Sequence, residues 1–271
     1  MVRVERVTKI FNPGEVNEVT ALRDVSLTVS QRELLVIIGG NGSGKSTLLN
    51  LVAGTVFPTE GKIVISDKDL SKVPVYERAS LIGRVFQDPL QGTSGGLTIE
   101  ENFALAAARG EFRGLGPALG RKLREKIRDR LALLGLGLED RMKTKVGLLS
   151  GGQRQAMTIL MAVFKRPDVL LLDEHTAALD PRASRKIMDL TRSIVEEQQL
   201  TTLMITHNLT HAVDLGRRTI IMNQGRIVRE LTSEYLAQMT DQDLLALFWE
   251  TQRRNEDPDE IDRGSGLSPT G

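Results

Sequence analysis

The feature that most constrains this chain is a glycine-rich segment between a continuously apolar run and a helix-forming run. Residues 34–38 predict a strand buried on both faces, and residues 45–53 predict a helix. The pattern G-x-x-x-x-G-K-S joins them and comprises Gly39, Gly40, Asn41, Gly42, Ser43, Gly44, Lys45 and Ser46. A strand, a glycine loop and a helix in this order predict a loop that binds the phosphates of a nucleoside triphosphate.

Each residue type in this loop has a chemical role. Glycines let backbone N–H groups converge on an anion, and the start of the helix adds partial positive charge. We expect Lys45 to reach the β and γ phosphates, Ser46 to offer its hydroxyl to Mg²⁺, and Thr47 to add a donor on the α-phosphate side. The alternative is a glycine-rich turn with an incidental lysine. It is disfavoured because every position of the pattern occurs in the expected context.

The composition excludes several other classes of protein. The 271 residues include 36 basic and 35 acidic side chains, so the net charge of +1 provides no global field for wrapping nucleic acid. The absence of cysteine excludes disulfides, thiol catalysis and cysteine-bound metal clusters. Unbroken aliphatic runs reach about five residues, whereas a membrane-spanning helix needs about 20. We therefore expect no nucleic-acid partner, no membrane span and no secretory leader in residues 1–11.

Apolar runs alternate with helical patterns along most of the chain. Strands that alternate with helices predict an α/β fold with a mainly parallel, helix-covered sheet. The further candidates for buried strands are residues 81–86, 169–172, 203–205 and 219–222. In contrast, the run 25–29 alternates with period two and should be half-buried, within a β-rich start that extends to about residue 65.

Other parts of the chain depart from this alternation. Between about residues 88 and 166, β-branched runs disappear, and helical patterns at 104–108 and 122–134 indicate an inserted helical subdomain. Asn223-Gln224-Gly225, between two short apolar runs, predicts a β-hairpin. Residues 255–271 are acidic and almost free of apolar side chains, so we expect a disordered tail after a domain that spans 1–254.

Two adjacent carboxylates, Asp173 and Glu174, follow the apolar run 169–172. At the C-terminal end of a parallel strand they would emerge beside the phosphate loop. Asp173 suits Mg²⁺ through water, and Glu174 could polarise an attacking water as a general base, which predicts hydrolysis and not phosphoryl transfer. Two solvated acids at a strand end are the alternative, which the neighbouring phosphate loop disfavours.

A second glycine pair lies in Leu149-Ser150-Gly151-Gly152-Gln153, just before the apolar helical run 156–164. Serine and glycine at the start of a helix can form another anion-binding nest. By itself, however, Ser150 reads as an ordinary N-cap. Both interpretations stay open on these residues alone.

The phosphate loop, the L-S-G-G-Q segment and the aliphatic strand with Asp-Glu, in this order, resemble the ATP-binding-cassette (ABC) ATPase family over about residues 2–229. The resemblance implies a P-loop NTPase core with a mainly parallel sheet, an N-terminal antiparallel β subdomain and an inserted α-helical subdomain. It also implies ATP and Mg²⁺ as cofactors and a head-to-tail pair of chains, either two copies or two related subunits. Ser150, Gly151, Gly152 and Gln153 of one chain would then close over the γ phosphate that Lys45 of the other holds.

The same resemblance implies roles for four further residues. Phe11 would stack on adenine, although it could instead be a core aromatic. Gln87 would touch Mg²⁺ and the attacking water, although it could be a surface residue. His207 would contact the γ phosphate, the alternative being a structural hydrogen bond. Asp180 would report to the second chain and could also be an N-cap before Pro181.

One segment departs from the family pattern. After Glu174 most members have Pro-Thr-Ser, where this chain has His175, Thr176 and Ala177. The departure bears on the conformation of this loop and not on the two carboxylates.

A chain without a membrane span would need separate membrane subunits to act in transport. The resemblance implies integral permease subunits, which would dock near residues 87–102 and hold this chain at the cytoplasmic face of a bacterial membrane. Segments 12–18, 83–89 and 174–181 resemble an importer branch with a branched-chain-amino-acid-type permease and an extracytoplasmic solute-binding protein. The solute would be small, such as an amino acid, and no residue here identifies it.

Other functions share parts of this pattern. An exporter or a lipoprotein-release motor has the same motifs. A soluble ATPase of an assembly machine stays open, whereas a clamp acting on DNA or ribosomes is disfavoured because the chain has neither a long coiled coil nor a second cassette. A kinase is disfavoured because Glu174 and His207 suit attack by water.

Overall fold

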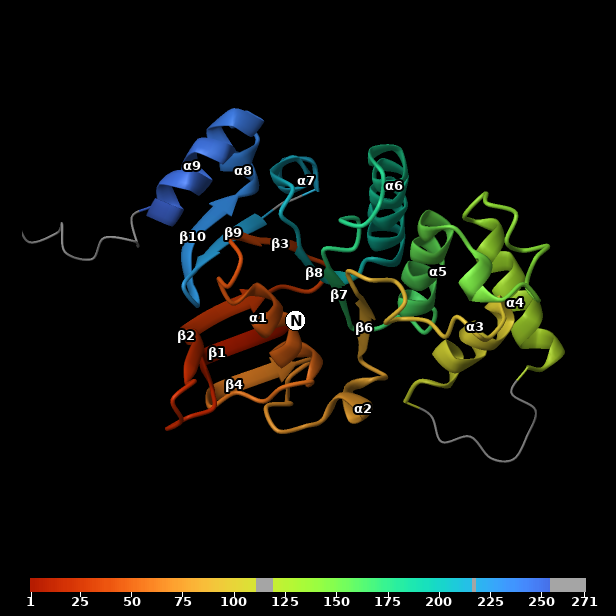
Figure 1. The fold of residues 1–271 in the computed structure, drawn as a ribbon, viewed down its shortest axis with the longest axis horizontal. Helices are drawn as coiled ribbons and strands as arrows, with labels where there is room; N and C mark the ends of the chain where they lie inside the picture. The colour runs from red at the N-terminus through yellow and green to blue at the C-terminus, as the bar shows by residue number, and fades with distance from the viewer. Residues whose placement is uncertain (111–118, 216–217, 254–271) are drawn as a thin grey trace, which may run out of the picture.

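The central element is a six-stranded sheet in the order β10-β9-β3-β8-β7-β6. The computed structural model describes residues 1–110, 119–215 and 218–253 (Figure 1). Neighbouring strands from β9 to β6 run parallel, and only β10 is antiparallel to its neighbour. The strands are β3 (Leu34–Gly39), β6 (Ile82–Val85), β7 (Val169–Asp173), β8 (Thr201–Ile205), β9 (Arg218–Asn223) and β10 (Arg226–Thr232). The predicted mainly parallel α/β sheet is confirmed.

The N-terminal part forms a second, antiparallel sheet in the order β2-β1-β4-β5. Its strands are β1 (Val2–Phe11), β2 (Val19–Val29), β4 (Glu60–Ile65) and β5 (Lys68–Asp69). Along β2, Val25, Leu27 and Val29 are buried while Ser26 and Thr28 are exposed, so the period-two pattern marks a half-buried strand as predicted. The antiparallel β subdomain is therefore present.

Helix α1 (Lys45–Ala53) fills the space between the two sheets. Leu48, Leu49, Leu51 and Val52 of α1 share one hydrophobic core with inward residues of both sheets. Each such side chain stabilises the fold by about 1.5–3 kcal/mol when it is fully buried. This packing holds the helix that follows the phosphate loop against the ends of the central strands.

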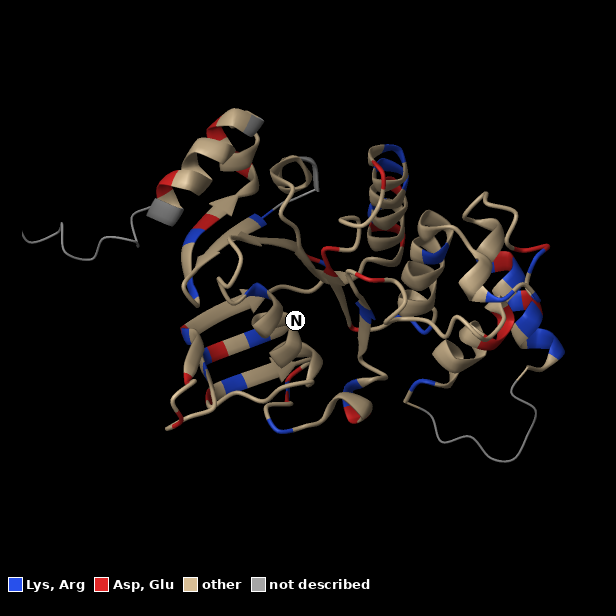
Figure 2. Ribbon diagram, viewed as in Figure 1, with Lys and Arg blue, Asp and Glu red and all other residues tan. Residues whose placement is uncertain are grey.

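Helices cover the opposite face of the central sheet (Figure 1). They include α5 (Gly151–Val163) and α6 (Pro181–Gln198), and α3 (Ile99–Ala108) and α4 (Arg121–Ala132) pack against α5 on the side away from the strands. Charged residues gather on α4, which buries only Ile127 and Leu131 (Figure 2). Phe103 and Phe164 meet edge to face at 5.4 Å between ring centroids, which joins α3 to the end of α5.

Helix α3 begins five residues earlier than the predicted run 104–108. Thr98 and Glu101 form a capping box, in which the threonine hydroxyl accepts from the Glu101 N–H and the Glu101 carboxylate accepts from the Thr98 N–H. This box satisfies two donors at the start of the helix. Helix α4 ends at Ala132 and not at the predicted residue 134.

The remaining elements are short or C-terminal: α2 (Val75–Arg78), η1 (Val146–Leu148), α7 (Leu209–Leu215), α8 (Ser233–Leu236) and α9 (Asp241–Arg253). The predicted hairpin joins β9 to β10, with Gln224 at φ 45 and Gly225 at φ 77. Two successive positive φ angles are the geometry of a tight two-residue hairpin turn. The predicted tail 255–271 lies outside the described residues, and the boundaries 1–254 and 88–166 stay predictions.

Candidate functional site

The phosphate loop has the predicted order of strand, glycine loop and helix. It leaves β3 at Gly39 and enters α1 at Lys45. A Cβ at Gly39 would lie 2.5 Å from the carbonyl oxygen of Met222, and one at Gly44 would lie 2.6 Å from that of Ala21. Gly44 also has φ 100, which L side chains rarely adopt. The loop is therefore held so closely by β9 and β2 that glycine is required at both positions.

Lys45 is buried in this loop, with 7% of its surface exposed. Its Nζ donates to the carbonyl oxygens of Gly39 at 2.9 Å and Gly40 at 2.8 Å. Burial lowers the pKa of Lys45 below its ordinary value, while the negative charges of Glu174 and Asp173 oppose that shift. The ammonium group therefore lies close enough to the two carboxylates to interact with their charges.

Hydroxyl groups line the loop and the start of α1. Ser43 Oγ is buried and has no hydrogen-bond partner among the described residues. A buried hydroxyl without a partner costs free energy, so it is available to a group that enters the loop. Ser46 is exposed and Thr47 half-buried on the first turn of α1, and Asn41 and Gly42 are exposed on the loop itself. These groups fit a phosphate with a bound Mg²⁺.

The two carboxylates lie together at the C-terminal end of β7, as predicted. Asp173 pairs with Ile205 at the end of β7, and the Glu174 N–H donates to the Ile205 carbonyl at 3.1 Å. Burial raises the pKa of Asp173, the Glu174 charge adds to this, and the cations of Arg84 and Lys45 oppose it. The carboxyl ends of β3, β7 and β8 thus bring Lys45 and both acids to one edge of the sheet.

Glu174 and His207 contact each other at this edge. His207 Nδ1 lies 3.3 Å from Glu174 Oε2. The His207 side chain is 62% exposed, so it does not serve as a buried structural histidine, and Glu174 is 20% exposed. Glu174 has φ 44, a left-handed conformation that costs roughly 1–3 kcal/mol for a non-glycine residue. A carboxylate beside an exposed imidazole can orient a water and take its proton.

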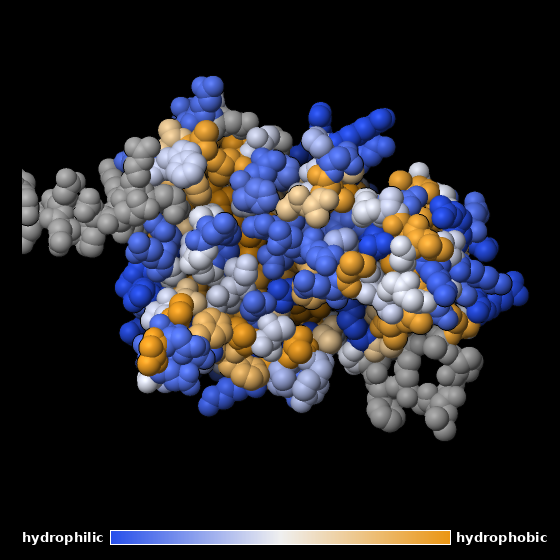
Figure 3. Space-filling view, in the orientation of Figure 1, coloured by the Kyte–Doolittle hydropathy of each residue, from blue (hydrophilic) through white to orange (hydrophobic). Residues whose placement is uncertain are grey.

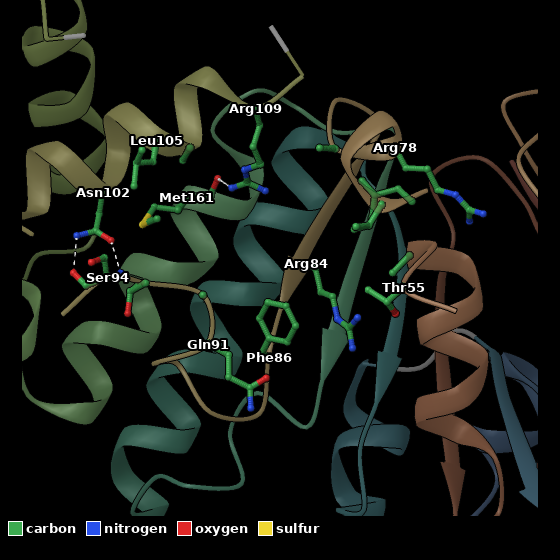
Figure 4. Close-up of a pocket in the computed structure, with 17 residues that line it drawn as sticks. Thr55, Arg78, Arg84, Phe86, Gln91, Ser94, Asn102, Leu105, Arg109 and Met161 are labelled. Carbon is green, nitrogen blue, oxygen red and sulfur yellow. Dashed lines mark hydrogen bonds between the residues drawn. The ribbon is translucent and has the colours of Figure 1, made fainter. Parts of the chain in front are cut away.

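Gln87 leaves the sheet at the same edge. Val85 of β6 pairs in parallel with Leu172 of β7, so Gln87 follows β6 where Glu174 follows β7. Gln87 is exposed. It begins the segment that leads to the helices, and Asn102 of α3 holds that segment through two hydrogen bonds with the Ser94 backbone at 2.8 and 3.0 Å (Figure 4).

Phe11 lies at the end of β1 and belongs to neither of the two hydrophobic cores. The alternative of a core aromatic is therefore not supported. Its backbone pairs with Val19, two residues before Ala21, whose carbonyl lies against Gly44. Lys9 Nζ lies 4.8 Å from the centre of the Phe11 ring. The half-buried ring is thus carried by the sheet that contacts the phosphate loop.

The N-cap interpretations of Ser150 and Asp180 are confirmed. Ser150 Oγ accepts from the Gln153 N–H at 3.2 Å, and Gln153 Oε1 accepts from the Ser150 N–H at 3.1 Å. Asp180 Oδ1 accepts from the N–H groups of Arg182 and Ala183 at 3.0 Å each, with proline in the first turn. Neither cap excludes the further roles, which stay predictions.

Ser150 and the phosphate loop lie in different parts of the chain. Strands β6 and β7 separate α1 from α5 (Figure 1). A Cβ at Gly151 or Gly152 would meet its nearest side chain at 3.6 Å, an ordinary contact. The fold of a single chain therefore does not require glycine at these two positions, in contrast with Gly39 and Gly44.

The residue that departs from the family pattern has an anchoring contact. His175 is 3% exposed, and its Nε2 lies 3.1 Å from Thr191 Oγ1 in the middle of α6. Burial, together with the charge of His211, lowers the pKa of His175 to about 3. The neutral imidazole attaches the loop after Glu174 to α6. The partner is 16 residues away, so no local pattern could have revealed it.

Sequence reasoning also missed Arg78, which is completely buried. Its Nε donates to Val73 O, its Nη1 to the carbonyls of Leu51 and Val52 at 2.8 and 2.7 Å, and its Nη2 to Leu70 O. Burial lowers its pKa to about 10. Arg78 thus satisfies carbonyl groups at the end of α1, a charge favoured by the helix dipole.

A pocket of about 440 Å³ lies between α1, α2 and β6 on one side and α3 and α5 on the other (Figure 4). Three arginines, Arg78, Arg84 and Arg109, and no acidic residue line it. The exposed apolar side chains Val75 and Leu105 are also part of its lining. In Figure 3 apolar side chains reach the surface over both the β-rich part and the helical part of the molecule.

The described residues contain neither a ready-made metal-binding cluster nor a membrane-spanning helix. No group of three or more acidic or histidine side chains could hold a metal ion by itself. Mg²⁺ usually takes one or two protein ligands together with substrate phosphates, so Ser46 and Asp173 as its ligands stay a prediction. None of the described helices is both long enough and apolar enough to cross a bilayer.

Comparison with known proteins gives concordant results. The family model described as "ABC transporter" matches residues 22–177. A tyrosine transport ATP-binding protein of Clostridioides difficile is 38% identical over 250 residues, which cover 92% of this chain and 98% of that protein. A sulfate/thiosulfate import ATP-binding protein, CysA 2, of Agrobacterium fabrum is 34% identical over 247 residues, which cover 91% of this chain and 68% of that protein.

Solved structures have the same fold. The dimeric structure of a post-hydrolysis state of the ATP-binding cassette MJ0796, bound to ADP and Pi, superposes with a TM-score of 0.73. It is 32% identical and covers 86% of this chain and 99% of the solved chain.

Proposed function

This chain belongs to the ABC transporter family, and from this membership we propose that it hydrolyses ATP at the ends of β3, β7 and β8 to drive separate permease subunits. It is an ABC-type ATPase subunit of a transporter. The observation that carries the proposed site is the contact of Glu174 with His207 beside the buried Lys45. This arrangement suits attack on a phosphate by water.

Each residue has a task in this mechanism. Lys45 and the loop N–H groups hold the β and γ phosphates. Ser46, Asp173 and Gln87 would hold Mg²⁺, which would neutralise charge on the phosphate oxygens. Glu174 accepts the proton of the attacking water, and His207 orients this carboxylate and the γ phosphate. Phe11 offers its ring to the adenine.

We propose further that two chains pair head to tail. Ser150, Gly151, Gly152 and Gln153 of one chain would then close over the phosphate held by the other, with Asp180 reporting between them. Two observations support this. Helix α5 lies apart from the phosphate loop, and the fold of a single chain does not require glycine at its positions 151 and 152. The N–H groups of Gly151 and Gly152 are not used by the capping box and suit an anion.

Import of a small solute is the transport reaction we propose. The relative named for sulfate or thiosulfate import supports import over export, and the relative named for tyrosine transport supports a small solute. A branched-chain-amino-acid-type permease and an extracytoplasmic solute-binding protein would complete the system. The subunit would work at the cytoplasmic face of the membrane.

The pocket between α2, β6 and α3 is the docking site that we propose for the permease. It adjoins the segment after Gln87, so a segment bound there is one loop away from the catalytic edge. Its mixed apolar and arginine lining suits a short amphipathic segment.

Glu174→Gln tests the proposed site. We expect hydrolysis to fall by about 100-fold or more because the base is lost, while ATP binding stays and Mg-ATP converts the variant to a dimer. Phosphate release and light scattering measure the two effects. The matched control is Glu196→Gln, an exposed carboxylate on α6 that should change neither. Undiminished hydrolysis by Glu174→Gln would refute the base assignment.

A further inference from the structure

We infer that Arg84 connects the pocket to the metal site: its guanidinium pairs with Asp173 until an acidic side chain of the permease segment takes it over, which releases Asp173 for Mg²⁺. The inference rests on the docking proposed above. The partner must then present an acidic residue, and its docking affects Mg-nucleotide binding through Arg84.

Arg84 lies between the pocket and the candidate metal site. It lies on β6, its Nη2 is 3.3 Å from Asp173 Oδ2, and its side chain is 13% exposed. Its guanidinium carbon lies 4.6 Å from the centre of the Phe86 ring. Figure 4 shows the Arg84 and Phe86 side chains next to each other in the wall of the pocket. One side chain thus borders both the candidate metal ligand and the space for a partner.

Arg84 has hydrogen-bond donors that no described residue accepts. Its Nε is buried and has no hydrogen-bond partner among the described residues. In contrast, the three nitrogens of Arg78 all donate to backbone carbonyls, and Arg109 Nη2 donates to Met161 O at 2.6 Å. A guanidinium carries five N–H groups and accepts none, so the unused donors of Arg84 suit a carboxylate.

The charge of the pocket selects the occupant. Its lining has three cations and no acid, and much of the rest is apolar. Opposite charges attract more strongly where apolar walls exclude water. A permease segment with an aspartate or glutamate facing Arg84 therefore complements the pocket in charge and in shape.

The exchange has a consequence for Mg²⁺. While Arg84 holds Oδ2, the same oxygen is less able to hold the metal or its bound water. A partner carboxylate that attracts Arg84 removes this competition. Because coupling between two sites is reciprocal, the permease tightens Mg-nucleotide binding by the same factor by which Mg-nucleotide tightens docking.

The first test uses the isolated full-length subunit. The measurement is the factor by which Mg²⁺ tightens binding of the non-hydrolysed analogue ATPγS, by calorimetry with and without EDTA. We expect Arg84→Met to raise this factor about five-fold or more, within the usual range of coupled sites. Arg109→Met, in the same pocket but without contact to Asp173, should leave it unchanged. An unchanged factor in Arg84→Met, or in Arg84→Gln if Met prevents folding, overturns the competition.

The second test identifies the partner chemistry. The chain has no cysteine, so Leu105→Cys carries a single benzophenone crosslinker at the pocket in the complex isolated from its membrane. Mass spectrometry should find a permease segment with an acidic residue, and its Asp→Asn or Glu→Gln change should return the Mg²⁺ factor of the complex to that of the isolated subunit. A crosslinked segment without an acid overturns the exchange and leaves the docking proposal intact. Absence of any permease crosslink contradicts the docking itself, whatever the first test shows.

Discussion

Two helices linked to ATP, α1 and α5, begin in opposite ways. Helix α1 starts after Gly44, which offers no side-chain cap, and the hydroxyl of the neighbouring Ser43 is buried without a described partner. Helix α5 starts after Ser150, whose capping box with Gln153 satisfies two donors. The first start leaves donors open to an anion, whereas the second is capped by its own side chains.

The glycines of the two starts differ in the same sense. At Gly39 and Gly44 a Cβ would clash with backbone oxygens of the same chain, and at Gly151 and Gly152 it would not. The fold itself demands the first pair, whereas only close approach by another molecule gives a reason for the second pair. The following substitutions test this contrast, in order of decreasing expected effect.

Lys45→Ala should remove the function of the uncapped start of α1. We expect ATP hydrolysis to fall by about 100-fold or more, because the cation that faces the phosphates is lost. Phosphate release measures the loss. Lys68→Ala, an exposed lysine on β5, is the control and should keep the rate of the unchanged protein. Full activity of Lys45→Ala would count against the phosphate loop.

Exchanging glycine for alanine compares the two starts directly. Gly44→Ala should destabilise the fold by about 1–3 kcal/mol and abolish nucleotide binding, because both φ and the Ala21 carbonyl oppose a side chain. Gly152→Ala should keep stability and nucleotide binding but prevent the ATP-dependent dimer in the Glu174→Gln background. Urea unfolding and light scattering separate these effects. A normal dimer from Gly152→Ala would contradict the role proposed for α5.

Removal of the Ser150 cap tests whether the capped start of α5 has only a structural role. Ser150→Ala should cost about 1 kcal/mol of unfolding free energy. Thr98→Ala removes the equivalent cap of α3 and is expected to cost a similar amount. Only Ser150→Ala should also weaken ATP-dependent dimerisation. If the two variants dimerise equally well, the serine is a cap and nothing more.

The pH dependence of stability tests the anchor of the catalytic loop. The pKa of His175 is about 3 in the folded chain, below its ordinary value of 6.5, so acid favours the unfolded state, which binds the proton. The contribution is fully present above pH 6.5 and is lost as the pH falls towards 3.

Between about pH 7.5 and about pH 6 the loss from this residue is about 0.8 kcal/mol. His175→Gln should remove that part of the pH dependence in urea unfolding. Thr191→Val should lower stability while keeping the slope, since the imidazole stays buried. A slope that is the same in His175→Gln and the unchanged chain would show that His175 is not a buried neutral group.

Short-range patterns predicted the main elements well. The run 34–38 became β3 and the run 169–172 became β7, because continuous apolar stretches flanked by loop residues suit only the centre of a parallel sheet. The start of α3 was misplaced because the run 104–108 covers only its apolar half, and the capping box at Thr98 went unnoticed. The parallel order then explains why Lys45, Asp173 and His207 meet, since strand ends of one direction share one edge.

What the sequence determined by itself was therefore the phosphate loop, the acidic pair and the family, all carried by contiguous residues whose spacing has one physical purpose. The contacts of Arg84, Arg78 and His175 became visible in the folded chain alone. Each of these cations or imidazoles is defined by a partner on another element, Asp173, the end of α1 and Thr191. Burial and pairing depend on which surfaces pack together, and a linear sequence pattern does not specify those surfaces.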